Sequence, residues 1–170
     1  YESGWNMSLG TSFMISQNAY SNSWAGGEVG GASWAFNLNY KALGQLGQFL
    51  RSENNAKLAF GQSHIQESET KNWQKPYKST DLIDIESVLR TTFKIFVNPF
   101  ASVRFESQFL DVSEPNNSRI INPEKLTESI GLAKPIIQDK NRELVLRASA
   151  SMKQNIDRNK TNPLTLEKKT

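Results

Sequence analysis

The chain has 170 residues, of which 37% are hydrophobic and 22% charged, with a net charge of +3, so its composition is that of one ordinary domain. It has no cysteine, which excludes disulfides and thiolate metal sites, and no dense basic patch with interleaved aromatics, which argues against nucleic-acid binding. No run approaches the roughly 20 apolar residues of a membrane helix. The mean hydropathy of −0.55 does not exclude a membrane β-barrel, whose strands carry apolar residues only at alternate positions.

Alternation of apolar and polar residues with a period of two is the main signal along the chain. Between Trp5 and Ser16 the odd positions are mostly apolar and the even positions are mostly small and polar. Successive side chains of a strand point to opposite faces, so this segment predicts a strand between two environments. The same alternation, weakened by Lys134 and Pro135 in the fifth segment, predicts further strands near residues 32–41, 55–61, 83–97, 101–109, 127–136 and 144–153.

The length of these strands and of their connections indicates the fold class. Several strands reach the roughly 9–11 residues that a tilted strand needs to cross a bilayer. Long polar connections alternate with shorter ones, as in outer-membrane barrels. The connections are expected near residues 17–28, 64–81 and 112–126 at one end and near 42–53, 98–99 and 138–142 at the other, the last two tight. We therefore predict an all-β, antiparallel, up-and-down transmembrane β-barrel with about seven strands visible.

Residues 1–155 are expected to hold the strands and loops of the barrel, and residues 156–170 a polar tail or a truncated continuation. Bacterial barrels have even strand numbers and usually end in a strand. Lys160 to Thr170 is polar and does not have the pattern of a closing strand. We therefore expect a fragment that lacks its C-terminal strands, with a short barrel and a soluble tail as the alternative.

The two faces of the strands have different expected surroundings. We expect lipid contact for Trp5, Leu9, Phe13, Trp34, Phe36, Tyr40, Phe93 and Phe105. We expect the interior to receive Asp84, Glu86, Arg90, Lys94, Arg104, Glu106, Arg147 and Lys153. The mixed signs of these charges favour a salt-bridged interior over a selective ring in an open pore. Trp5 and Tyr40 fall at one end of the apolar face, which suits an interfacial aromatic girdle.

Three segments carry a resemblance to a known family. They are Ser16-Gln17 with Asn22–Glu28, then Asn55–Gly61, then Lys78–Ser87. In this order they resemble a family of Gram-negative outer-membrane proteins catalogued as a domain of unknown function (number 3078), over about residues 5–110. The resemblance implies a barrel in the bacterial outer membrane and no particular activity. Its first loop contributes Trp24, Gly26, Gly27 and Glu28.

Candidates for chemistry are few. His64 is the only histidine, and Asp81 lies at the other end of the same predicted loop, so a hydrolase would need a serine beside them. A solvated loop histidine is the simpler interpretation. One histidine without cysteine argues against a metal site. The aromatics of residues 72–77, together with Trp24, could anchor an extracellular ligand or protein, or pack the loops onto the rim.

We therefore expect a non-enzymatic outer-membrane barrel without cofactor, in a structural or passive-transport role. Its expected partners are outer-membrane lipid and an extracellular ligand or protein at the long loops. The first alternative is an outer-membrane enzyme that acts on lipid. The second is a soluble, lipocalin-like barrel that binds a hydrophobic ligand, in which Leu9, Phe13, Phe36 and Phe93 fill the core instead of touching lipid. An adhesin or assembly partner is a third.

Overall fold

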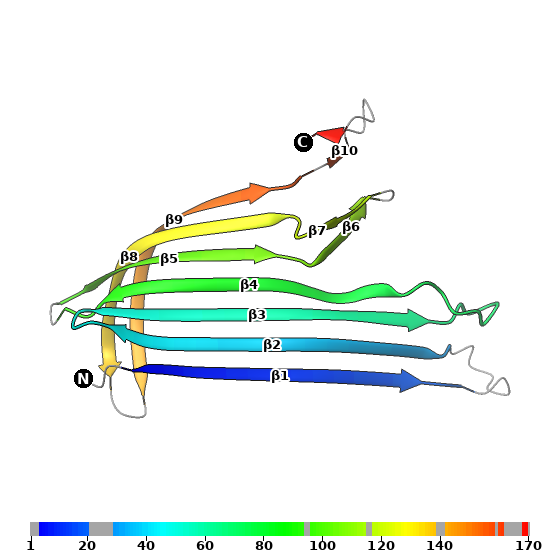
Figure 1. Cartoon of the computed structure of the whole chain (residues 1–170), viewed down its shortest axis with the longest axis horizontal. Helices are drawn as coiled ribbons and strands as arrows, with labels where there is room; N and C mark the ends of the chain where they lie inside the picture. The colour runs from blue at the N-terminus through cyan, green and yellow to red at the C-terminus, as the bar shows by residue number, and fades with distance from the viewer. Residues whose placement is uncertain are drawn as a thin grey trace.

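The computed structural model describes residues 4–20, 29–93, 96–114, 117–138, 142–158, 160–161 and 168–169. In these residues seven strands form one antiparallel sheet in the order β1-β2-β3-β4-β5-β8-β9 (Figure 1). Its strands are β1 (Trp5–Asn18), β2 (Gly31–Leu46), β3 (Leu50–Ile65), β4 (Tyr77–Thr91), β5 (Asn98–Ser107), β8 (Glu124–Gln138) and β9 (Glu143–Ile156). Two small separate pairs are β6 (Leu110–Glu114) with β7 (Asn117–Ile120) and β10 (Lys160–Thr161) with β11 (Lys168–Lys169).

The prediction of seven strands is confirmed, and all of them except β4 are longer than the pattern indicated. They run from 10 residues in β5 to 16 in β2 and β3. Within the described residues the sheet does not close on itself, because β1 and β9 are each paired on one side only. In the same residues, no helix is long and apolar enough to cross a membrane.

The turn between β2 and β3 is much shorter than the predicted connection over residues 42–53. It consists of residues 47–49, and Gly47 has a φ of 73°, a conformation that glycine adopts without strain. The alternation was hidden at Gly44, which has no side chain to contribute to the apolar face. The Trp5 ring covers Gly44 instead, so closely that a Cβ there would lie 2.6 Å from the ring.

The prediction of one strand over residues 83–97 and a tight turn at 98–99 was wrong. β4 ends at Thr91 and β5 begins at Asn98, so Phe93 lies in the connection rather than on a strand. Its ring packs 5.5 Å from the Phe49 ring in the neighbouring turn. Apolar residues in the connection therefore extended the alternating pattern beyond the end of the strand. Lys94 lies outside the described residues.

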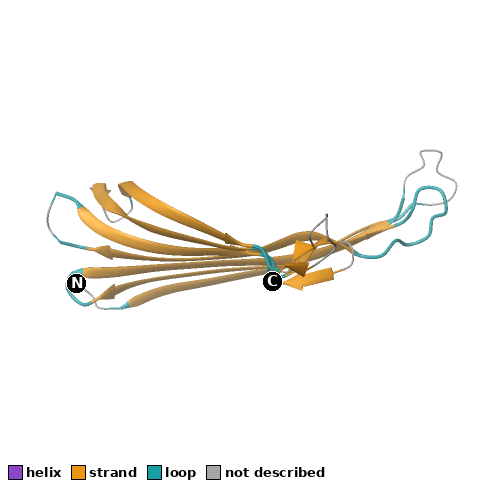
Figure 2. Cartoon of the chain, turned by 90° about the horizontal axis from the view of Figure 1, so that it is seen from above, coloured by secondary structure: helices purple, strands orange, loops and turns teal. Residues whose placement is uncertain are grey.

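The predicted weakness of the strand near Lys134 and Pro135 marks a bend in β8. The register with β9 shifts between Pro135 and Ile137, since proline offers no N–H to the ladder. Such a bulge bends the strand and increases its twist. Figure 1 shows β8 and β9 curving round at this end, and Figure 2 shows the sheet as one curved layer.

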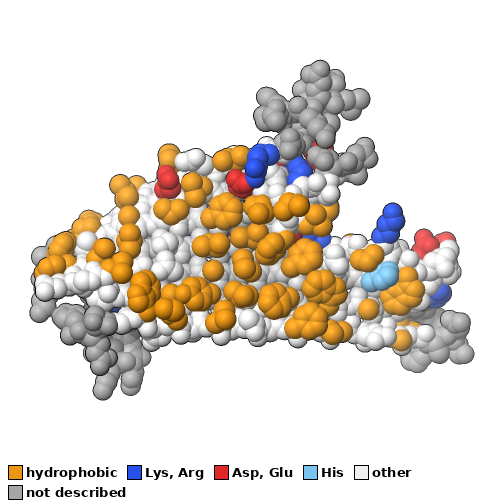
Figure 3. All heavy atoms as spheres, viewed as in Figure 1, with side chains coloured by type: hydrophobic (Ala, Val, Ile, Leu, Met, Phe, Trp, Pro, Cys, Tyr) orange, Lys and Arg blue, Asp and Glu red, His pale blue; other side chains and the backbone are white. Residues whose placement is uncertain are grey.

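The curvature gives the sheet a convex and a concave face. Cross-strand partners share a face, and the row Phe13–Phe36–Phe60 is an example on the apolar one. On the opposite face Arg147 of β9 lies 3.3 Å from Glu53 of β3, although three strands separate them in the sheet. The polar face is therefore concave and the apolar face convex. Figure 3 shows the convex face, on which hydrophobic side chains are spread over all the long strands.

The first prediction concerns the contact between β8 and β9. A Cβ on Gly131 would lie 2.3 Å from the Ala148 carbonyl oxygen, whereas a Cβ on Gly10 would meet nothing within 4 Å. We expect Gly131→Ala to lower the free energy of unfolding by about 1–3 kcal/mol through overpacking. The matched Gly10→Ala should change it by less than about 0.5 kcal/mol. Urea unfolding in detergent measures both, and equal effects would contradict the close approach.

Candidate functional site

Two adjacent cross-strand rows of polar residues cross the middle of the concave face, and we call them the charged belt. The register places each residue of a row directly opposite the next, on successive strands from β2 to β9. The first row is Lys41, Asn55, Glu86, Arg104, Thr127 and Lys153, and the second is Asn39, Lys57, Asp84, Glu106, Lys125 and Asn155.

Arg104 organises the acidic centre of the charged belt. Its Nε and Nη2 donate to the two carboxylate oxygens of Asp84 at 2.8 and 2.9 Å. The same guanidinium lies 3.6 Å from the Glu106 carboxylate. A bidentate arginine–carboxylate pair is geometrically specific as well as strong. One arginine therefore contacts two of the three belt carboxylates, and its closer partner is Asp84.

A second group, the Glu53 cluster, lies on the concave face at the turn end. The Glu53 carboxylate lies 3.6 Å from Arg51, 3.6 Å from Arg90 and 3.3 Å from Arg147. The Arg147 guanidinium also lies over the Phe100 ring at 5.8 Å. One carboxylate thus contacts three guanidinium groups from β3, β4 and β9. The contact with Arg147 of β9 stabilises the curvature of the sheet.

A small apolar group lies beside the Glu53 cluster on the same face. Val88, Phe100 and Ala133 are buried, and Val145 packs against them. The curl of β8 and β9 covers these residues. The concave face is therefore closely packed at the turn end, whereas the charged belt lies where the sheet is more open.

The sequence-predicted site residues fall on the two faces as follows. The concave face carries Asp84, Glu86, Arg90, Arg104, Glu106, Arg147 and Lys153. The convex face carries Trp5, Leu9, Phe13, Trp34, Phe36, Tyr40 and Phe105. Their contact with a lumen or with lipid stays a prediction. Sequence reasoning missed Glu53 and Arg51, because both lay in or beside the long connection expected over residues 42–53.

Aromatic side chains form a row across the loop end of the convex face. Ring centroids lie 6.1 Å apart for Phe13 and Trp34, 5.8 Å for Trp34 and Phe60, and 6.1 Å for Phe60 and Phe109. At the turn end, the Tyr40 hydroxyl donates to the Met7 sulfur at 3.6 Å. The apolar face is thus bounded by aromatic residues near both ends.

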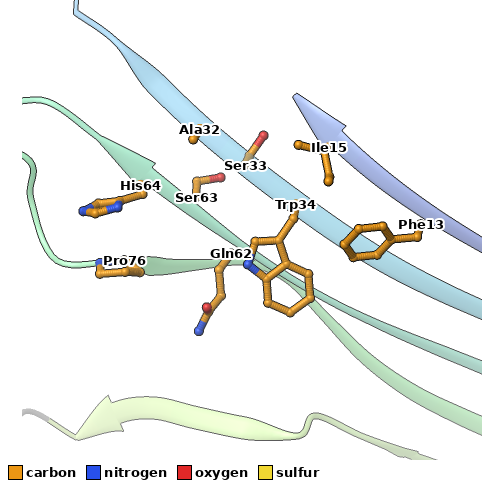
Figure 4. Close-up of a pocket in the computed structure, with 9 residues that line it drawn as sticks. All are labelled: Phe13, Ile15, Ala32, Ser33, Trp34, Gln62, Ser63, His64 and Pro76. Atoms are coloured by element: carbon orange, nitrogen blue, oxygen red, sulfur yellow. The ribbon is translucent and has the colours of Figure 1, made fainter. Parts of the chain in front are cut away.

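A hollow of about 580 Å³ lies at the loop end of the convex face (Figure 4). Ile15, Trp34, His64 and Pro76 line it with other residues of β1, β2 and β3. His64 belongs to β3 rather than to a loop, and its ring lies 4.9 Å from the Trp73 ring. The hollow has an apolar lining and opens at the surface.

The structure does not bring Asp81 to His64. The Asp81 carboxylate accepts from the backbone N–H groups of Phe109 and Leu110 at 2.6 and 2.9 Å, and the Lys78 ammonium lies 3.2 Å away. Asp81 therefore anchors the segment after β5 instead of orienting a histidine. Among the described residues, no three His, Asp or Glu side chains lie close enough together to hold a metal ion.

The loop residues divide into two groups. Trp73, half exposed, forms an isolated β-bridge with Gln66, whose side-chain oxygen accepts from the Gly30 N–H at 2.9 Å. This loop is therefore packed onto the rim of the sheet. The motif residues Trp24, Gly26, Gly27 and Glu28 lie outside the described residues.

A buried polar cluster, not predicted from the sequence, joins the β6–β7 hairpin to Asp157, the residue that follows β9. Arg119 donates to Asp111 at 2.5 Å and to Asp157 at 3.0 Å. Asn122 donates to the same two carboxylates at 2.7 and 2.9 Å. Burial raises the pKa of Asp111, but hydrogen bonds from Ser113 and Asn122 and the charge of Arg119 outweigh it, so the pKa falls to about 2.

The second prediction tests the Glu53 cluster. Glu53→Gln leaves three arginines without their shared carboxylate, so we expect the free energy of unfolding to fall by roughly 2–4 kcal/mol. Glu106→Gln is the matched control, because Glu106 is more exposed and contacts one arginine at 3.6 Å. It should cost less than about 1 kcal/mol. Equal losses, measured by urea unfolding, would contradict a central role for Glu53.

The third prediction concerns pH. Because the folded-state pKa of Asp111 is about 2 against an ordinary 3.8, its stabilisation is present above pH 3.8 and is lost as the pH falls through 2. We expect the free energy of unfolding of the wild type to exceed that of the Asp111→Asn variant by about 2 kcal/mol at neutral pH. This difference should become small near pH 2. Hydrogen exchange of β6 and β7 against pH measures it, and a constant difference would contradict the assignment.

Comparison with known proteins gives one match. No curated protein and no solved structure shows a significant similarity to the chain. The family described as "Protein of unknown function (DUF3078)" matches residues 15–112, which run from the end of β1 into β6 and include the central strands β2 to β5. This match covers more than half of the chain and confirms the resemblance drawn from its motifs, so the chain belongs to the DUF3078 family.

Proposed function

We propose that the chain forms the wall of a β-barrel in the bacterial outer membrane, in a structural or passive-transport role. The observation that carries this proposal is the distribution of side chains over a curved sheet. Apolar residues predominate on the convex face, which also carries Glu128 and Lys134 of β8, while the Glu53 cluster and the charged belt occupy the concave face. A membrane barrel needs this arrangement, since its outside meets lipid and its inside meets water.

The exposure of the convex face supports a lipid environment. Leu9, Ile15 and Ile130 expose 65%, 73% and 70% of their surface, and they belong to an apolar face that spans the sheet. Soluble monomers rarely leave apolar patches beyond a few hundred Å² in water. A lipocalin-like barrel would turn these residues inward, onto the concave side. The geometry therefore favours the membrane over the soluble alternative.

The dimensions of the apolar face also suit a bilayer. Eight residue steps separate Trp5 from Phe13 on β1, which is about 26 Å at ~3.3 Å per residue. For a strand tilted by about 40°, that corresponds to roughly 20 Å along the membrane normal, close to the ~25 Å apolar band of outer-membrane barrels. The aromatic residues at the two ends would then lie near the two interfaces, where amphipathic rings are favoured.

The expected partners follow from the two ends of the sheet. Outer-membrane lipid would cover the convex face and fill the apolar hollow beside Trp34. The packed loop that carries Trp73 would present an aromatic side chain to an extracellular ligand or protein. The Asp81 carboxylate, held by backbone N–H groups and Lys78, gives no support to an enzymatic role through His64.

The fourth prediction compares two neighbours on β2. The chain has no cysteine, so one introduced cysteine is its only thiol. Phe36 faces the convex side and Asn37 the concave side. We expect a fluorophore on Phe36→Cys to be quenched by nitroxide-labelled acyl chains, and one on Asn37→Cys to be quenched by acrylamide in water. Each variant is the control of the other, because the positions are adjacent.

Membrane fractionation and gel mobility test the same proposal independently of the quenching experiment. The full-length protein should be recovered in the outer-membrane fraction and should change its mobility on SDS gels when boiled, as closed barrels do. A monodisperse protein in water without detergent would contradict the membrane proposal. Quenching of Asn37→Cys by acyl chains would reverse the assignment of the two faces.

A further inference from the structure

We infer that the interior lined by the concave face prefers anions, so that small inorganic or organic anions are the solutes it admits. This inference rests on the proposed function and adds the class of solute. Among the strand residues whose side chains the structure describes, the concave face carries eight cationic and four anionic groups, a net charge of +4 over these residues. The cations are Lys41, Arg51, Lys57, Arg90, Arg104, Lys125, Arg147 and Lys153, and the anions are Glu53, Asp84, Glu86 and Glu106.

Arginines and lysines on this face differ in their contacts. Arginines hold the carboxylates, since Glu53 meets three of them and Arg104 meets Asp84 and Glu106. Glu86, the remaining carboxylate, lies directly opposite Arg104. The Glu53 cluster and the charged belt therefore each keep a net charge of +2, and in the belt this excess is carried by lysines.

The four belt lysines have no ion pair with any described residue. Lys41 lies between Ser8 and Asn55, and Lys153 lies opposite Thr127. The other two have acidic neighbours that are already held by Arg104. Lys57 lies opposite Asp84, and Lys125 lies opposite Glu106. The ammonium groups thus remain available to solutes.

The placement of these lysines suits an anion path. Two lie on β2 and β3 and two on β8 and β9, on either side of the carboxylates of β4 and β5. The sheet curls at the turn end, where β9 reaches β3 at the Glu53 cluster, so the two lysine pairs lie on the two flanks of a curved face. Although the belt also holds three carboxylates, its net charge is positive, and an excess of basic side chains along a pore raises the local concentration of anions.

The fifth prediction is the ion preference of the full-length protein in planar bilayers under a KCl gradient. We expect the reversal potential to indicate chloride over potassium. Lys57→Glu with Lys153→Glu lowers the net charge of the twelve charged side chains named above from +4 to 0, so the preference for chloride should be abolished. The milder Lys57→Gln with Lys153→Gln should lose about half of the shift. The effect should be largest at low salt, since about 0.15 M salt screens charges beyond ~8 Å.

Lys71→Glu with Lys75→Glu is the matched control, because it makes the same change of charge in the β3–β4 connection, away from the belt. It should retain most of the chloride preference. An equal loss in this control would overturn the anion inference alone, and so would a wild-type preference for potassium. The same holds if a protein that is heat-modifiable and recovered in the outer membrane shows no conductance. Absence from the membrane fraction would overturn the proposed function as well.

Discussion

The two-residue period of the β-strand is the constraint on which this structure depends. With an unbroken register, every cross-strand row belongs wholly to one face, and a slip by one residue would exchange the faces. The two register shifts of the main sheet lie towards opposite ends, between Gly61 and Gln62 and between Pro135 and Ile137. Both rows of the charged belt lie between these shifts, so no lysine of the belt is turned into the apolar face.

Because the sheet is curved, its polar face is concave and can line the interior of a barrel. The shift at Pro135 bends β8 and β9, and Arg147 then reaches Glu53 across three intervening strands. The arginines of the described concave face contact its carboxylates, and the belt lysines have no ion pair with a described residue, so they are the cations best placed to meet solutes.

The faces were predictable from the sequence, whereas the contacts were not. Alternation is a local property, so Trp5 to Ile15 could be assigned to a strand, and Asp84 and Arg104 to the polar side, without coordinates. The turns were harder, because Gly44 interrupts the apolar pattern and Phe93 extends it past the end of β4. The Glu53 cluster and the Asp111–Arg119–Asn122–Asp157 cluster join residues far apart in the chain, and no local pattern signals them.

The lipid-facing assignment places a demand on the edges of the sheet. In hydrocarbon an unpaired backbone N–H or C=O costs several kcal/mol, and only a closed barrel satisfies all of them. Within the described residues, the 14-residue strands β1 and β9 are paired on one side only. If the convex face meets lipid, both outer edges must therefore be paired, either with each other or with further strands. The curl at the Glu53 cluster supports such closure, since it turns β9 back towards the side of the sheet where β1 lies.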